Sequence, residues 1–81
     1  MTRAGFQVDI GPGLSADEFA ECERRAAALS NTELHGAIAD LEATIRVCER
    51  SVRDGFPVRK LGAYCDTLLT YCAERTRRQT S

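Results

Sequence analysis

Four cysteines are the residues of this 81-residue chain that could most readily bind a metal ion or form disulfides. No two of them have the Cys-x-x-Cys spacing that is typical of zinc sites. Cys65 and Cys72 lie seven residues apart, about 10 Å along a helix, whereas a Zn–S bond is only ~2.3 Å long. One zinc site using all four thiolates is therefore disfavoured, although two separate thiol pairs remain possible. We expect buried, reduced thiols and no bound metal. The cysteines are Cys22, Cys48, Cys65 and Cys72.

The other groups that could support catalysis do not form a recognisable site. His35 is the only histidine, and no Cys or Ser stands where a helix would place a nucleophile beside it. Ser15 and Ser30 each precede a glutamate by three residues, which is the pattern of a helix capping box. The chain has no Walker loop, no GxGxxG and no HExxH motif. We therefore expect no enzyme activity, no catalytic residue, no cofactor and no small-molecule substrate.

Two series of apolar residues, spaced by three and four, lie on either side of residues 54–57. This spacing is typical of the face by which one helix packs on another. Gly55 can end the first helix and Pro57 can open the second, so the sequence predicts an antiparallel helical hairpin. The first series is Leu34, Ile38, Leu41, Ile45, Cys48 and Val52, and the second is Val58, Leu61, Cys65, Leu68 and Cys72.

The expected fold is an all-α, three-helix domain at residues 14–81, dominated by this hairpin. Helices are predicted at about 16–29, 31–54 and 57–78, the first two beginning at the capping boxes. Residues 1–13 are predicted to be a flexible or extended N-terminal arm, because Gly11-Pro12-Gly13 blocks any helix. Within the arm, Phe6, Val8 and Ile10 alternate with polar residues as in a short strand.

The two apolar series also predict the register of the hairpin. If the chain turns about residue 56, residues whose numbers sum to about 113 face each other. All four pairs formed in this way are apolar on both sides, and this agreement between independent series supports the hairpin. The pairs are Val52 with Leu61, Cys48 with Cys65, Ile45 with Leu68, and Leu41 with Cys72.

The third helix carries more apolar surface than the hairpin requires. Tyr64 and Tyr71 lie on one flank of the seam and Leu69 on the other, and the first helix must cover one flank. We predict a partner-binding surface made of Tyr64, Leu68 and Tyr71 with Arg75 at its rim. The alternative is that both tyrosine rings edge the core. A stripe of small residues on the second helix could also seat the first helix or a second copy, and consists of Gly36, Ala39, Ala43 and Val47.

Charge is distributed unevenly along the chain. Residues 1–44 hold three basic and eight acidic side chains, whereas residues 45–81 hold eight basic and four acidic ones. This asymmetry is compatible with self-association as a homodimer, or with a partner that has its own charge pattern. The alternative is the ordinary preference of helix starts for acidic residues and of helix ends for basic ones. A basic cluster near the hairpin tip makes nucleic acid or an acidic partner the alternative. The cluster consists of Arg46, Arg50, Arg53, Arg59 and Lys60, with Glu49 and Asp54 among them.

The length of the chain and its glycine-containing turn resemble the short helical co-chaperones of type III secretion needle subunits. The turn Gly55-Phe56-Pro57 also resembles that of the small subunit of exodeoxyribonuclease VII. Both resemblances imply a helical hairpin and cover about half of the chain. The basic Arg59 and Lys60 after the turn depart from the exodeoxyribonuclease subunit, and the cysteine-rich seam departs from the needle co-chaperones. Neither resemblance assigns a functional residue.

Together these observations predict a small non-enzymatic helical adaptor or inhibitor, of bacterial or phage type, that acts by protein–protein interaction. The alternatives are a small nucleic-acid-binding regulator, a phage-encoded inhibitor of a host nucleic-acid machine, and a secretion-type co-chaperone. The chain has no signal-peptide-like apolar stretch and no apolar run of membrane-spanning length. We therefore expect a cytoplasmic protein that does not bind a membrane.

Overall fold

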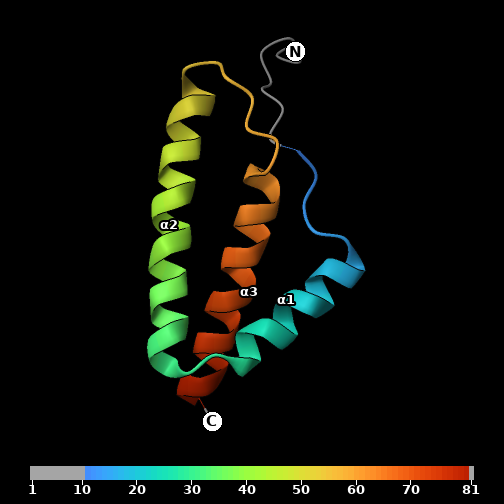
Figure 1. The fold of residues 1–81 in the computed structure, drawn as a ribbon, viewed down its shortest axis with the longest axis vertical. Helices are drawn as coiled ribbons and strands as arrows, with labels where there is room; N and C mark the ends of the chain where they lie inside the picture. The colour runs from blue at the N-terminus through green and yellow to red at the C-terminus, as the bar shows by residue number, and fades with distance from the viewer. Residues whose placement is uncertain (1–10, 81) are drawn as a thin grey trace.

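The structure is a computed structural model that describes residues 11–80. Within this range it contains three helices, α1 at Ala16–Ala28, α2 at Asn31–Arg53 and α3 at Leu61–Thr80. α2 and α3 form a long antiparallel hairpin, and α1 lies obliquely against the C-terminal half of α3 (Figure 1). The predicted all-α, three-helix fold is confirmed, and the bounds of α1 and α2 lie within one residue of those predicted.

Both α1 and α2 begin at the predicted capping boxes. The Ser15 amide donates to the Glu18 carboxylate at 2.8 Å, and the Glu18 amide donates back to the Ser15 hydroxyl at 3.2 Å. Ser30 and Glu33 repeat the arrangement at 2.8 and 3.1 Å. Each box satisfies backbone N–H groups that have no partner inside the helix. The corner between α1 and α2 is therefore only two residues long.

α3 begins four residues later than predicted, at Leu61 rather than at Pro57. Residues 56–60 form an irregular connection instead of a helical turn. Phe56, which precedes Pro57, has no side-chain oxygen that could cap a helix beginning at Pro57. Val58, expected to open the second apolar series on the helix, is half-buried within this connection.

Residues 11–14 form a strap that crosses the first turns of α3. The Leu14 amide donates to the Asp66 carboxylate at 2.9 Å. A Cβ atom added at Gly62 would lie 2.8 Å from the carbonyl oxygen of Gly11, so this close crossing depends on glycine. Part of the predicted N-terminal arm is thus in contact with α3, while residues 1–10, with the strand-like alternation, lie outside the described residues.

The core is thin and lies where all three helices meet. Cys22 and Ala26 of α1, Leu34 and Ile38 of α2, and Tyr71 of α3 are its buried members. Ile45 and Leu61 are buried farther along the hairpin, and the remaining predicted seam positions are half-buried. No helix in residues 11–80 is both long enough and apolar enough to cross a membrane.

Candidate functional site: a groove between α1 and α3

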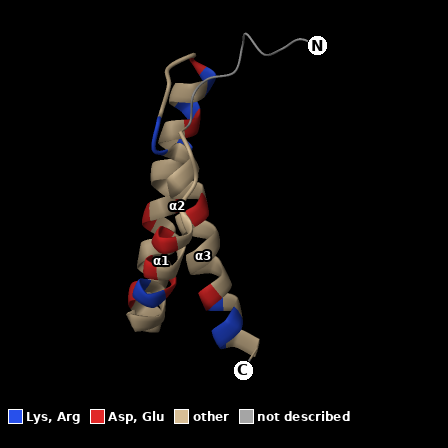
Figure 2. Ribbon diagram, turned by 90° about the vertical axis from the view of Figure 1, so that its right-hand side faces the viewer, with Lys and Arg blue, Asp and Glu red and all other residues tan. Residues whose placement is uncertain are grey.

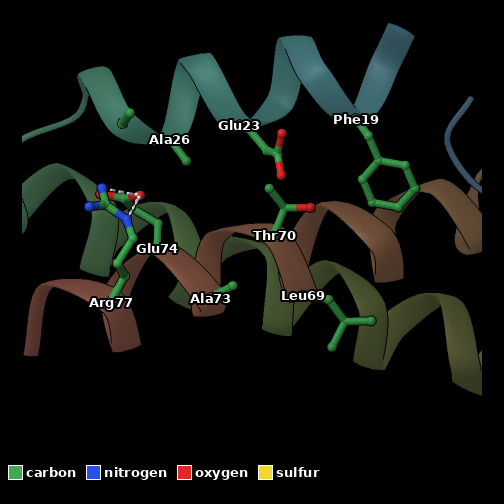
Figure 3. Close-up of a pocket in the computed structure, with 9 residues that line it drawn as sticks. Phe19, Glu23, Ala26, Leu69, Thr70, Ala73, Glu74 and Arg77 are labelled. Atoms are coloured by element: carbon green, nitrogen blue, oxygen red, sulfur yellow. Dashed lines mark hydrogen bonds and ion pairs between the residues drawn. The ribbon is translucent and has the colours of Figure 1, made fainter. Parts of the chain in front are cut away.

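A groove of about 500 Å³ lies between α1 and α3. α1 supplies one wall and the C-terminal half of α3 supplies the other (Figure 3). The lining residues are Phe19, Glu23, Ala26 and Ala27 of α1, and Leu69, Thr70, Ala73, Glu74 and Arg77 of α3.

Small side chains at the contact between the helices keep the groove open. Ala26 is 1% exposed and lets the backbone of α1 approach α3 closely. Ala27 and Ala73 lie beside it and are too small to fill the space above the contact. Phe19 and Leu69 flank the groove and remain 37% and 67% exposed. Two large apolar side chains thus border a cleft that residues 11–80 do not fill.

One end of the groove is closed by a charged cluster. The Arg77 guanidinium donates to the Glu74 carboxylate at 2.6 Å, and the Nε of Arg78 donates to the same carboxylate at 2.7 Å. These hydrogen bonds, of which the one from Arg77 contributes most, hold the pKa of Glu74 below its ordinary value. The Glu74 carboxylate thus pairs with both arginines, and of the two only Arg77 lines the groove.

A further carboxylate, that of Glu23, reaches from α1 toward Thr70 across the groove (Figure 3). Among residues 11–80 no salt bridge to Glu23 is formed. The groove therefore combines apolar walls with a carboxylate that residues 11–80 leave without a salt bridge. Such a site suits an apolar side chain of a partner that also carries a positive charge.

The predicted partner surface on α3 is only partly at the surface. Tyr71 is 6% exposed and belongs to the core, where α1 covers it. Leu68 is half-buried and packs against the same core, and Tyr64 and Arg75 are half-buried. Tyr71 is therefore unavailable as a surface anchor, which is the alternative that the sequence left open for the tyrosine rings.

The small-residue stripe on α2 does not seat α1, because α1 packs on α3. All four members of the stripe are exposed, and Val47 is 60% exposed. Unlike the groove, this face is convex helix surface with no second wall among the described residues.

The groove between α1 and α3 was not predicted from the sequence. The Ala26-Ala27-Ala28 run and Ala73 are the sequence signal that α1 and α3 could approach closely there.

The predicted basic cluster is exposed at the hairpin tip. Figure 2 shows basic positions on the upper part of α2 and in the connection to α3, with acidic positions between them. All five predicted side chains are exposed. They are Arg46, Arg50 and Arg53 of α2, and Arg59 and Lys60 of the connection.

The cysteines are free thiols, with Cys22 buried and the other three half-buried. Burial raises the pKa of Cys65, and Glu49, Asp66 and Cys48 raise it further. In residues 11–80 no three His, Cys, Asp or Glu side chains are arranged to hold a metal ion.

His35 is exposed beside a shallow recess of about 140 Å³ between the start of α2 and the end of α3, which it lines together with Arg75. No cysteine or serine lines this recess. The recess is much smaller than the groove and offers no nucleophile for His35 to activate.

Comparison of the chain with protein-family models, with curated proteins and with solved structures finds no match. The function is therefore argued from the geometry of the groove itself.

Proposed function

We propose that this protein is a small non-enzymatic adaptor or inhibitor that acts by binding a protein partner in the groove between α1 and α3. The observation that carries the proposal is the pair Phe19 and Leu69, two exposed large apolar side chains on opposite walls of one cleft. Binding energy at protein interfaces is concentrated in a few apolar anchors that fill pockets of this kind. An apolar side chain of the partner would displace water from both walls at once.

The proposal is tested by site-specific photo-crosslinking in cells of the source organism. A photoreactive phenylalanine analogue replaces Leu69 in the groove or, as a control, Val47 on the outer face of α2. The two positions are matched, because their side chains are 67% and 60% exposed. We expect discrete protein adducts from position 69 and none above background from position 47. Absence of any adduct at position 69, or identical adducts at both positions, would contradict the proposal.

A second variant pair separates binding from folding. Leu69→Ser removes one wall of the groove at a position that is 67% exposed, so the melting temperature should change little. The adducts formed by a probe at the neighbouring groove residue Ala73 should nevertheless disappear. Val47→Ser removes a comparably exposed apolar side chain and should leave these adducts unchanged.

The basic hairpin tip supports a second candidate, a small nucleic-acid-binding regulator. Five exposed basic side chains lie there with the exposed ring of Phe56, and exposed aromatic rings can stack on bases. Glu49 and Asp54 reduce the positive potential of this surface. A gel shift that weakens steeply with added salt and is lost on reversing Arg46, Arg50 and Arg53 would favour this candidate over the adaptor.

A further inference from the structure

The hairpin tip presents a large apolar side chain, that of Phe56, at the end of α2. Gly55, with φ 93°, follows the last residues of α2, and its amide donates to the Val52 carbonyl at 2.9 Å. The Phe56 amide donates to the Ser51 carbonyl, also at 2.9 Å. This pair of hydrogen bonds is a Schellman motif, in which the residue at the position of Phe56 usually packs on an apolar residue one turn back.

Here the residue one turn back is Ser51, which offers no apolar surface. Phe56 is 65% exposed, and the two backbone hydrogen bonds fix the backbone that carries it. An anchor on an already ordered backbone loses less conformational freedom on binding than one on a mobile loop. Phe56 therefore has the properties of a pre-organised anchor for an apolar pocket.

The groove has the complementary properties. Its volume of about 500 Å³ is bordered by Phe19 and Leu69, and aromatic rings pack favourably on such walls. The charges also match. Residues 50–60 contain four basic side chains and one acidic one, whereas α1 contains four acidic side chains and two basic ones. Arg53 and Lys60 flank Phe56 in the sequence, and the Glu23 carboxylate in the groove forms no salt bridge with any of residues 11–80.

The positions of the tip and the groove allow two copies of the chain to bind each other through the same contact made twice. The molecule is 45 Å long, with the tip at one end and α1 beside the opposite half of α3 (Figure 1). When two copies lie antiparallel, the tip of each is brought to the groove of the other. A twofold arrangement of this kind is closed and forms the same contact twice.

We propose that the occupant of the groove is a second copy of this chain, whose Phe56 inserts between Phe19 and Leu69 while Arg53 and Lys60 approach Glu23. This inference rests on the proposed function, because it names the protein that the groove binds. Its product is an antiparallel homodimer with two identical contacts.

Sedimentation equilibrium with purified protein tests the inference directly. We expect a monomer–dimer equilibrium for the wild type, and an increase of at least about tenfold in the dissociation constant for either Phe56→Ser or Leu69→Ser. Both side chains are largely exposed, so circular dichroism melting curves should match that of the wild type. Val47→Ser, at a comparably exposed position outside the groove and the tip, should leave the dissociation constant unchanged.

Mixing experiments distinguish tip-into-groove contacts from a dimer formed by one shared face. Phe56→Ser lacks the anchor but retains the groove, while Leu69→Ser lacks a groove wall but retains the anchor. Neither variant alone forms an intact contact, but a mixed dimer forms one. We therefore expect dimers in an equimolar mixture at concentrations where each variant alone is monomeric. No gain on mixing would overturn the tip-into-groove arrangement.

Charge-reversal variants on the two sides of the contact provide a third test. Glu23→Lys and the double variant Arg53→Glu with Lys60→Glu should each weaken the dimer, and a mixture of the two proteins should restore association. A wild type that stays monomeric at the highest soluble concentration overturns the second copy as occupant. Crosslinks from position 69 to a different protein would in that case still support the proposed adaptor function. If position 69 also formed no crosslinks in cells, both the homodimer and the adaptor function would be contradicted.

Discussion

The Arg78 guanidinium, near the end of α3, donates a hydrogen bond to the backbone carbonyl of Leu29 at 2.8 Å. The same group donates to the Ala26 carbonyl at 3.1 Å and to the Asn31 side chain at 2.7 Å. The last carbonyls of a helix have no partner within that helix, so Arg78 caps α1 from another element. One side chain thereby joins all three helices.

Replacing Arg78 with Ala should destabilise the protein by about 2–3 kcal/mol, because several carbonyls lose a charged donor and Arg78 is largely covered. Urea unfolding followed by circular dichroism measures the loss. Arg77→Ala is the control, since Arg77 binds the same Glu74 carboxylate but is 66% exposed and forms no hydrogen bond with α1. Equal effects of the two substitutions would contradict the capping role.

Alanine substitutions at two glycines should change stability in opposite directions. At Gly62 an added Cβ would lie 2.8 Å from the Gly11 carbonyl oxygen, so the strap must move and we expect a loss of ~1–3 kcal/mol. At Gly36 no atom lies within 4 Å of the added Cβ, and alanine should stabilise α2 by ~0.5–1 kcal/mol. The two urea midpoints test this, and a stabilising Gly62→Ala would show that the strap does not press on α3.

Stability should depend on pH through Glu74. Hydrogen bonds from Arg77 and then Arg78 lower its pKa in the folded state below the ordinary value of 4.5. The folded protein therefore binds a proton at Glu74 less tightly than the unfolded chain does. The stabilisation that the charged Glu74 carboxylate provides is fully present above pH 4.5 and is lost as the pH falls through the lowered pKa. Thermal melts from pH 7 to pH 3 should show Glu74→Gln less stable than wild type at pH 7.

The difference between the Glu74→Gln melt and the wild-type melt should shrink as the pH falls toward 3, because protonation of Glu74 makes it increasingly like the neutral glutamine. Glu42→Gln, which removes an exposed carboxylate on α2, controls for the change in net charge. A gap that stays constant over this pH range would show that the arginine contacts do not hold the carboxylate in its charged form.

The Cys65 thiol should react slowly with alkylating reagents at neutral pH. Its pKa is raised above the ordinary 9.0 by burial first and then by Glu49, Asp66 and Cys48, so little of the reactive thiolate is present. Alkylation by iodoacetamide at pH 7.5, read by peptide mass mapping, should be slower in the folded protein than in urea. Glu49→Gln should accelerate it by removing a nearby negative charge, whereas equal folded and unfolded rates would contradict the burial of this thiol.

Contacts between residues close in sequence determined much of this fold. The capping boxes Ser15–Glu18 and Ser30–Glu33 span only three residues, so the starts of α1 and α2 could be predicted to the residue. The repeat of apolar side chains at every third and fourth position likewise indicated the hairpin and its turn at Gly55. The start of α3 could not be predicted in this way, because no local cap defines it and the strap that crosses it comes from residues about 50 positions earlier.

The groove was decided by tertiary structure alone. Phe19 and Leu69 are fifty residues apart, and neither stands at a position whose spacing marks it as part of a site. Whether Tyr71 is covered, and whether Leu69 stays exposed, depends on which flank of α3 receives α1 and at what angle. That choice is made by the close contact at Ala26 and by the hydrogen bonds from Arg78, which are interactions between helices and leave no periodic signal in the sequence.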